Sequence, residues 1–177
     1  EAEGIVPTSS TTAQLALGDA IAIATMRYKK FDKMDFKKLH PAGSLGAQLK
    51  TVEDIMITGN KIPFVSEDLK TSKALKILSE KKLGILVVRD KSKKTKGIVT
   101  DGNIRRISQK NSNFQNLLVK EIMTKKPVSI DKNELAAKAL SIMNNKKITS
   151  LVVFDKKNPN ITTGVVHVHT ILQSNIS

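Results

Sequence analysis

The sequence of 177 residues contains no cysteine, no tryptophan and few aromatic residues of any kind. Without cysteine the chain can form neither a disulfide framework nor a thiolate metal site. Aromatic residues make up only 3% of the chain, and they do not alternate with basic residues as a platform for stacking nucleic-acid bases would require. These absences argue against a thiolate metal centre and against a base-stacking nucleic-acid module.

Long hydrophobic runs are also missing. No apolar run approaches the roughly 18 residues that cross a membrane. The apolar stretch Leu15–Met26 is interrupted by Asp19, and no basic segment of the signal-peptide type precedes it. We therefore expect a cytoplasmic protein that has no contact with a membrane.

Acidic residues are scarce relative to basic ones. The chain has 16 Asp and Glu against 30 Lys and Arg, which gives a formal net charge of +14. Such a balance is typical of proteins that meet acidic ligands, nucleic acid or a membrane surface. The lysines occur in pairs spread along the chain, such as Lys29–Lys30, Lys81–Lys82 and Lys125–Lys126. This spread favours a solvated lysine surface and argues against nucleic acid as a partner.

What the sequence does contain is an internal repeat. Gly97–Asn103 reads Gly-Ile-Val-Thr-Asp-Gly-Asn, and 67 positions later Gly164–Thr170 reads Gly-Val-Val-His-Val-His-Thr. Asp54–Met56 recurs as Glu121–Met123 at the same offset. Matches in one order indicate that a single supersecondary unit is used twice.

Each copy reads as a βαββα unit, so we predict an α+β fold in which two units pack together about a pseudo-two-fold axis. In the first copy, after a short helix at 52–56, we expect strands at 62–65, 84–90 and 97–100. Helices should begin at a cap formed by Thr71 or Ser72, and at Asp101, the latter ending near Gln109. In the second copy we expect strands at 127–130 and from Gly164, and a last helix at 170–174. The apolar run Ile85–Val88 predicts a strand buried on both faces.

Residues 1–50 have a different pattern. The hydroxyls of Ser9–Thr12 are expected to cap a helix that runs to about Lys30. Its apolar residues, including Leu15 and Ile21, are too evenly spread for one stripe, so it should be buried on several sides. Residues 1–50 cannot supply that core. Without an initiator methionine, the chain reads as a piece of a longer protein.

His40 stands at the break His40-Pro41-Ala42-Gly43-Ser44-Leu45-Gly46, after a short helix expected within 31–39. A side chain placed at such a break can be aimed into a cleft. A histidine that titrates near neutral pH can act there as acid or base. It can equally hold the corner of the backbone through a hydrogen bond, and the residues alone leave both roles open.

The repeated motifs resemble the CBS domain, named after cystathionine β-synthase, whose paired repeats form a Bateman module. The motifs are Asp54–Met56, Ala74–Leu75, Leu86–Val88 and Gly97–Asp101. The rest of the chain is similar to arabinose-5-phosphate isomerases, in which a sugar isomerase (SIS) domain precedes two CBS repeats. The stretches that carry this second resemblance are Pro7–Thr12, Leu17–Ala20, Asp35–Phe36, His40–Gly46, Thr100–Arg106 and His167–His169.

The resemblance implies three parts: the C-terminal tail of an SIS domain at 1–50 and CBS domains at 51–113 and 114–177. Enzymes of this family convert ribulose 5-phosphate into arabinose 5-phosphate, towards the lipopolysaccharide sugar Kdo, and are usually tetrameric. The chain would then be the regulatory C-terminal portion of a sugar-phosphate isomerase that needs no cofactor, and it would be inactive alone. His40 would be the catalytic histidine of a His-Pro-Gly-Gly motif in which Ala42 replaces the first glycine.

The resemblance also implies partners. The CBS pair would form homo-oligomers, dimers or tetramers, and would bind a nucleotide or a nucleotide sugar such as CMP-Kdo in the clefts between repeats. Two other functions stay open: a module that serves only oligomerisation, and a free-standing nucleotide-binding module.

CBS ligand sites usually lie where the Gly-φ-φ-Thr strand meets the following helix, which implies that Thr100 contacts phosphate or ribose. Asn103 and Thr170 stand where a carboxylate normally holds the ribose hydroxyls. An amide or a hydroxyl lacks the strength of a charge-assisted bond, so we predict a ligand other than a standard adenosine nucleotide.

The remaining candidates keep two interpretations each. Asp101 either caps its helix or contacts the ligand. Arg105 and Arg106 either bind a phosphate or sugar carboxylate or lie on a solvated helix face. His167 and His169 are predicted to point to opposite faces of a strand end, which argues against a shared metal ion. Either histidine contacts a ligand or a neighbouring subunit, or is an ordinary packed residue.

Overall fold

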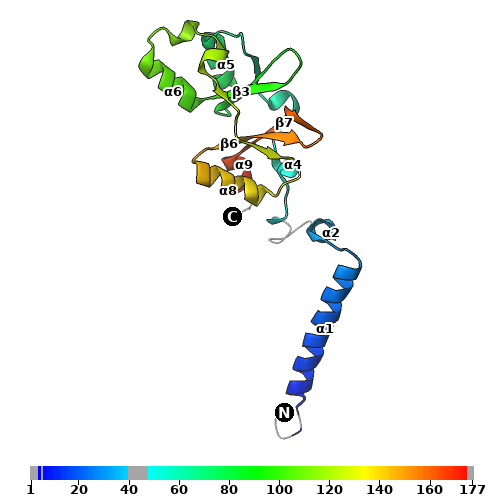
Figure 1. Ribbon diagram of the computed structural model, residues 1–177. Coiled ribbons are helices and arrows are strands. Elements are labelled where there is room, and N and C mark those ends of the chain that lie inside the picture. The colour runs from blue at the N-terminus through cyan, green and yellow to red at the C-terminus, as the bar shows by residue number, and fades with distance from the viewer. Residues whose placement is uncertain (1–3, 5, 40–47, 175–177) are drawn as a thin grey trace. The chain divides into compact units, whose positions relative to one another are not determined.

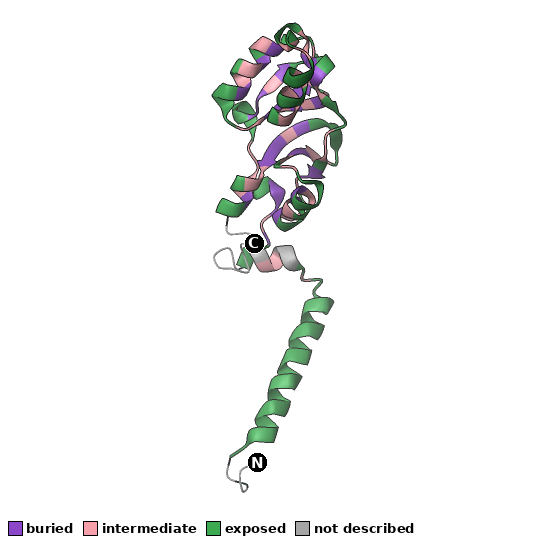
Figure 2. Ribbon diagram, turned by 90° about the vertical axis from the view of Figure 1, so that its left-hand side faces the viewer, coloured by how far each residue is buried: buried purple, intermediate pink, exposed green. Residues whose placement is uncertain are grey.

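The computed structural model of the chain describes residues 4, 6–39 and 48–174. They fall into two units, residues 1–46 and residues 47–177. The described part of the first unit contains the α-helices α1 (Thr8–Tyr28) and α2 (Lys33–Leu39). No residue of α1 is buried, and Leu15 is 68% exposed (Figure 2). An apolar helix with so much exposed surface has no core of its own, as the sequence indicated for residues 1–50.

The start of α1 differs from the prediction. The helix begins at Thr8 with Pro7 at the N-cap, because the fixed φ of proline already suits entry into a helix. Ser9–Thr12 therefore lie within the helix. The hydroxyl of Thr11 donates to the Pro7 carbonyl at 2.8 Å, and that of Thr12 donates to the Thr8 carbonyl at 3.0 Å. The predicted capping of free N–H groups is wrong.

The second unit contains the two predicted βαββα repeats (Figure 1). The first repeat follows the short helix α4 (Val52–Ile55) and comprises β1 (Phe64–Ser66), α5 (Thr71–Lys81), β2 (Ile85–Arg89), β3 (Thr95–Thr100) and α6 (Asp101–Lys110). The second follows α7 (Val119–Ile122) and β4 (Thr124–Lys125) and comprises β5 (Ser129–Asp131), α8 (Ala136–Lys146), β6 (Ser150–Asp155), β7 (Asn158–His167) and α9 (Val168–Gln173). No described helix is both long and apolar enough to span a membrane.

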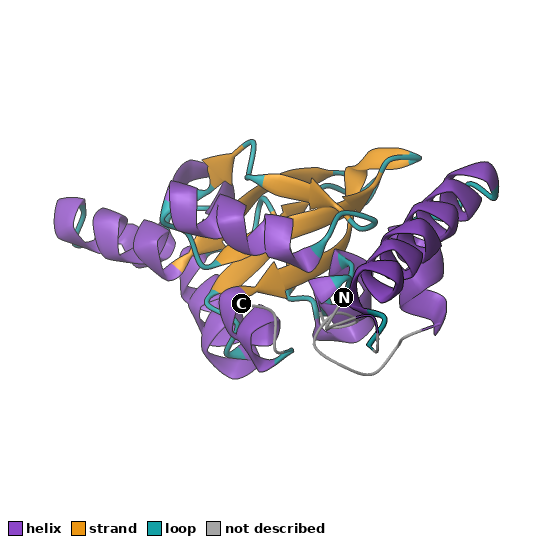
Figure 3. Ribbon diagram, turned by 90° about the horizontal axis from the view of Figure 1, so that it is seen from below, coloured by secondary structure: helices purple, strands orange, loops and turns teal. Residues whose placement is uncertain are grey.

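Each repeat forms its own sheet, with strand orders β1-β2-β3-β4 and β5-β6-β7. In both sheets the first pair of strands is parallel and the next is antiparallel. Phe64 pairs with Val87 in one sheet, and Ser129 pairs with Val152 in the other. The strands occupy the middle of this unit and the helices lie outside them (Figure 3). The predicted repeat is thus confirmed down to the strand register.

Several element ends differ from the prediction. The run Ile85–Val88 is buried throughout, as predicted. However, β3 begins at Thr95 and β7 at Asn158, both before the expected glycines, because each pairs with the preceding strand close to the turn. The last helix begins at Val168, earlier than expected. The two-residue strand β4 was not predicted, since nothing in so short a segment indicates its pairing.

Two predicted helix caps are wrong. Thr71 is the first residue of α5, and its buried hydroxyl donates to the Leu117 carbonyl at 2.9 Å, while Ser72 lies inside the helix. The cap of α6 is Thr100, and Asp101 is the first helical residue. Thr100 takes this role because its backbone is still extended, which is the geometry that an N-cap requires.

The short helices exchange places between the repeats. Val52 of α4 precedes the first repeat in sequence but packs in the core of the second, in one cluster with Leu151. Val119 of α7 precedes the second repeat but packs in the core of the first, in one cluster with Leu86. A third buried cluster contains residues of both repeats. Each repeat therefore completes its core with a helix that belongs in sequence to the other.

The residues after each short helix follow the same exchange. Thr124 pairs with Ile98 of β3, and Ile57 pairs with Val165 of β7. The two pairs are equivalent, because Thr124 lies 67 residues after Ile57 and Val165 lies 67 residues after Ile98. We call residues 55–57 and 122–125 the crossing segments. In each, the chain leaves a short helix that packs in the core of one repeat and continues into the other repeat.

Gly97 and Gly164 are each in close contact with a crossing segment. A Cβ at Gly97 would lie 2.6 Å from the Thr124 carbonyl oxygen and 3.0 Å from Met123 Sδ. A Cβ at Gly164 would meet the sulfur of Met56 and lie 3.2 Å from the Ile57 carbonyl oxygen. Glycine at position 97 is thus required by the close approach of the Thr124 backbone, whereas a Cβ at Gly164 would first displace the Met56 side chain.

Gly97→Ala is expected to lower the free energy of unfolding by about 1–3 kcal/mol, as overpacking does in well-packed cores. Urea unfolding followed by circular dichroism measures it. Gly102→Ala is the matched control, because its Cβ would meet only Thr100 Oγ1, at an ordinary 3.6 Å. Equal stability of Gly97→Ala and the wild type would contradict the role assigned to the crossing segment.

Candidate functional site

A cleft of about 720 Å³ lies between the two repeats. The first repeat contributes the end of β3 and the start of α6, and the second contributes the loop after β4, the turn before β6 and the end of β7. The cleft is within the size range of small-molecule sites in proteins. It brings together six of the predicted site residues: Thr100, Asp101, Asn103, Arg105, Arg106 and His167. His169 and Thr170 are not among the residues that line it.

Basic side chains dominate this cleft. Arg105 and Arg106 come from α6, while Lys126 and Lys147 come from the second repeat, and all four are exposed. Asp101 is the only carboxylate among the described lining residues. Cations that converge on one concave surface concentrate their field on an anion there. The arrangement therefore suits a ligand with more than one negative charge.

Sequence reasoning missed Lys126 and Lys147 as site residues. Lys147 has a left-handed backbone, φ 53°, at the C-cap of α8, and Lys126 has φ 55° after β4. The sequence has a lysine pair at each of these places, but lysine pairs are so common in this chain that these two could not be singled out as site residues. Only the fold shows which of them meet at one cleft.

The side-chain amide of Asn103 makes hydrogen bonds through both its oxygen and its nitrogen. Its Oδ1 accepts hydrogen bonds from the Thr100 backbone N–H at 3.1 Å and from the Thr100 hydroxyl at 2.8 Å. Its Nδ2 donates to the Ile122 carbonyl at 3.1 Å and to Thr124 Oγ1 at 3.0 Å. The bond from the Thr100 backbone N–H, together with the Asn103 backbone N–H that donates to Thr100 Oγ1 at 3.4 Å, forms a capping box at the start of α6. The residue predicted to replace a ribose-binding carboxylate is therefore used for internal contacts.

His167 and His169 stack on one another, with ring centroids 5.0 Å apart and planes 26° apart. The prediction that they point to opposite faces is wrong, because the strand ends at His167 and His169 lies in α9. Nδ1 of His167 accepts the backbone N–H of His169 at 3.2 Å. Burial first, and then the nearby charge of His169, lower the pKa of His167 from its ordinary 6.5.

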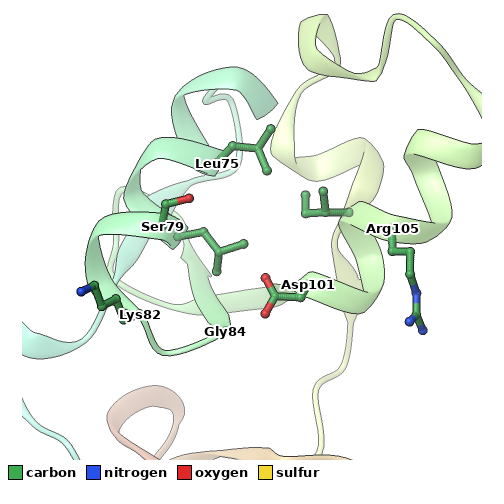
Figure 4. Close-up of a pocket in the computed structure, with 8 residues that line it drawn as sticks. Leu75, Ser79, Lys82, Gly84, Asp101 and Arg105 are labelled. Carbon is green, nitrogen blue, oxygen red and sulfur yellow. The ribbon is translucent and has the colours of Figure 1, made fainter.

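Asp101 faces a second, smaller groove on the outside of the first repeat, about 450 Å³ in volume (Figure 4). Its carboxylate points towards Gly84, while Arg105 points away from the groove (Figure 4). A Cβ at Gly84 would lie 3.0 Å from Asp101 Oδ2. Although Asp101 lines both hollows, its charge is directed away from Arg105, which leaves the larger cleft more basic.

Two further expectations concern catalysis and metals. His40 lies outside the described residues, so its catalytic role stays a prediction. Within the described ranges, no group of three or more His, Cys, Asp or Glu side chains is placed to hold a metal ion.

The chain matches one protein family and is similar to relatives that share one name. Residues 52–110 and 119–176 match the model of the CBS domain family. The arabinose 5-phosphate isomerase KdsD of Yersinia pestis is 39% identical over 98% of this chain and 52% of its own length. The protein of the same name from Francisella tularensis is 42% identical over 96% and 51%. The chain thus spans about half the length of the curated relatives it matches.

Among solved structures, CBSX2 in complex with AMP is similar in fold, with a TM-score of 0.61. It is 22% identical to this chain, and the match covers 70% of this chain and 94% of CBSX2. The likeness extends over the paired repeats, and it supports the predicted α+β fold of tandem CBS repeats.

The His167 geometry predicts a link between proton binding and anion binding. Because its pKa is lowered, the ring is mainly neutral at pH 7. An anion in the cleft favours the cationic form, so it should raise the pKa. NMR titration of the His167 ring with and without sulfate, whose charge is constant over this range, measures the shift. A midpoint that sulfate leaves unchanged would contradict placement of the anion beside His167.

Proposed function

This chain belongs to the CBS domain family, and from that premise we propose that its repeat pair is the ligand-sensing module of an arabinose-5-phosphate isomerase. The observation that carries the proposal is the cleft between the repeats, which is lined by four basic side chains and a single carboxylate among its described residues. Relatives 39–42% identical over nearly the whole chain are named arabinose 5-phosphate isomerase. The ligand is proposed to be an anionic nucleotide or nucleotide sugar, such as CMP-Kdo.

The chemistry of the cleft supports a nucleotide sugar acid. CMP-Kdo carries a phosphodiester and a carboxylate, two separate anionic groups. The guanidinium forks of Arg105 and Arg106 suit either group, and the ammonium groups of Lys126 and Lys147 add compact positive charge. CBSX2, which shares the fold, has been solved with AMP. In this chain Asn103 is already engaged, so a ligand gripped mainly through its ribose hydroxyls should bind less tightly.

The proposed parent enzyme converts ribulose 5-phosphate into arabinose 5-phosphate in the cytoplasm. Residues 1–50 would form the end of its SIS domain, and 51–113 and 114–177 its CBS domains, which would also support a dimer or tetramer. The exposed apolar side chains of α1 agree with a helix that belongs to a larger domain. Ligand in the cleft would change the activity of the isomerase site through a coupling free energy of roughly 1–3 kcal/mol.

The first test is isothermal titration calorimetry of this chain with CMP-Kdo and with AMP. CMP-Kdo is expected to bind more tightly, and Arg106→Gln is expected to weaken it roughly tenfold through the loss of a charge-assisted hydrogen bond. Lys73→Gln is the matched control, because Lys73 is an exposed cation of α5 that lines no part of the cleft. Equal losses in both variants would indicate a general charge effect.

The same titration separates the alternatives. No heat and no thermal shift with either ligand would contradict ligand sensing and favour a module that serves only oligomerisation. In that case the complete enzyme without residues 51–177 would lose its tetramer. Tighter binding of AMP than of CMP-Kdo would favour an ordinary adenosine-nucleotide sensor.

A second test concerns the proposed catalytic histidine. In the complete enzyme, His40→Ala is expected to reduce kcat by about 10²–10⁴-fold, the usual contribution of a general acid or base. The conversion of ribulose 5-phosphate is measured directly. Lys73→Gln serves as the control, because Lys73 is an exposed residue of α5 that lines no part of the sensing cleft. Near wild-type turnover in His40→Ala would exclude the catalytic assignment.

A further inference from the structure

The carboxamide of Asn103 has no hydrogen-bonding position left for a ligand. A carboxamide offers two N–H donors and one oxygen with two lone pairs. The oxygen receives the two Thr100 donors, and the two N–H groups go to Ile122 and Thr124. All four positions are therefore occupied by protein groups. Any ligand atom that binds Asn103 has to replace one of these contacts.

The two donor contacts reach the crossing segment that forms a wall of the cleft. Thr124 and Lys126 both line the cleft. The strand β4 is joined to β3 by only two residue pairs, Gly97 with Lys125 and Ile98 with Thr124. So short a ladder is weak by itself. The Asn103 amide adds two hydrogen bonds at its end, next to the point where the chain turns towards Lys126.

The equivalent place in the other repeat lacks this feature. Thr170 occupies the position of Asn103, 67 residues later, and Ile57 occupies the position of Thr124. Within the described part of the chain, the Thr170 hydroxyl makes no hydrogen bond to crossing segment 55–57 or to any other group. We call the two hydrogen bonds from Asn103 Nδ2 to Ile122 and Thr124 the latch, and the place where a crossing segment pairs with a strand a junction. Among the described residues, the junction of 122–125 has a latch and the junction of 55–57 has none.

We propose that Asn103 is a positioning and specificity-determining residue of the cleft. By holding the crossing segment 122–125, it fixes the wall from which Lys126 extends, and this pre-forms the cationic side of the site. Because it is saturated, it disfavours ligands that need an acceptor for vicinal hydroxyls at this position. The cleft then selects ligands through their anionic groups. The positioning role holds whether or not the proposed sensing function is correct, while the selectivity rests on that function.

The replacement Asn103→Asp exchanges a donor for an acceptor. One carboxylate oxygen would face the Ile122 carbonyl and could not form a hydrogen bond with it. A protonated carboxyl group regains one O–H donor, which happens near pH 4, close to the ordinary pKa of aspartate. In Asn103→Asp the hydrogen bond to the Ile122 carbonyl should therefore be lost at pH 7 and restored at pH 4, while the Thr124 hydroxyl can donate to the carboxylate at pH 7. In Asn103→Ala both hydrogen bonds should be lost at either pH.

Hydrogen exchange of the free chain tests the positioning role, with protection factors taken relative to the wild type at each pH. Amides of 97–98 and 124–125 are expected to lose roughly tenfold of their protection in Asn103→Ala, as for the loss of about one net hydrogen bond. Asn103→Asp should lose less protection than Asn103→Ala at pH 7, because the Thr124 hydroxyl can still donate to the carboxylate, and should regain protection at pH 4. Thr170→Ala is the matched control and should leave both junctions unchanged. Unchanged protection in Asn103→Ala, or equal loss in Thr170→Ala, would overturn the proposal.

Calorimetry then tests selectivity. The ratio of CMP-Kdo affinity to sulfate affinity is expected to rise at least tenfold in Asn103→Asp at pH 7, because the carboxylate can accept the ribose hydroxyls of CMP-Kdo, whereas sulfate has no such hydroxyls. An unchanged ratio would overturn the selectivity role. Failure of the wild type to bind either ligand would contradict the proposed function, while the exchange result would still decide whether Asn103 positions the wall.

Discussion

The close approach of each crossing segment to a glycine of the other repeat is the contact on which the second unit depends. At Gly97 the Thr124 carbonyl oxygen lies 2.6 Å from the position of a Cβ, and at Gly164 the Met56 side chain lies closest, with the Ile57 carbonyl oxygen at 3.2 Å. Because of this contact the short helices can reach the opposite cores, where Val52 and Val119 are fully buried. Neither repeat has a complete core in its own sequence range. The two must form together, which is why they are expected to behave as one cooperative unit.

The cleft is a consequence of the same exchange. A crossing segment that pairs with β3 carries the following loop to the point where β3 passes into α6. The loop brings Lys126 to the cleft that Arg105 and Arg106 also line, and Lys147, the C-cap residue of α8, lines it as well. Four cations from elements distant in sequence converge because of backbone pairing, without any direct attraction between them. Their mutual repulsion is reduced by solvent exposure, and an anionic ligand would reduce it further.

The repeat, its strands and the residue types of the cleft could be predicted because hydrophobic runs and the recurrence of Gly97 at Gly164 are local signals. The exchange could not, since the apolar pattern of Val52–Ile55 shows that a helix is buried but not in which core. The same limit explains the two histidines: the alternation rule was applied one residue beyond the end of the strand, and the helical backbone brought the rings together. Lys126 and Lys147 were indistinguishable from the other lysine pairs until the fold placed them.

Asn103 shows how a symmetric framework can hold an asymmetric site. The sequence marked Asn103 and Thr170 as departures from a carboxylate and treated them as equivalent losses. In the structure they differ. The amide can donate and accept at once, so it joins Thr100 to the crossing segment, whereas the shorter hydroxyl of Thr170 makes no such bond among the described residues. A carboxylate at position 103 would lack the donors for the Ile122 carbonyl and would be left available to a ligand. In the proposed site, replacing one carboxylate oxygen by an NH₂ group therefore turns a ligand-binding group into a structural one. The arginines and lysines around it then have to recognise the ligand.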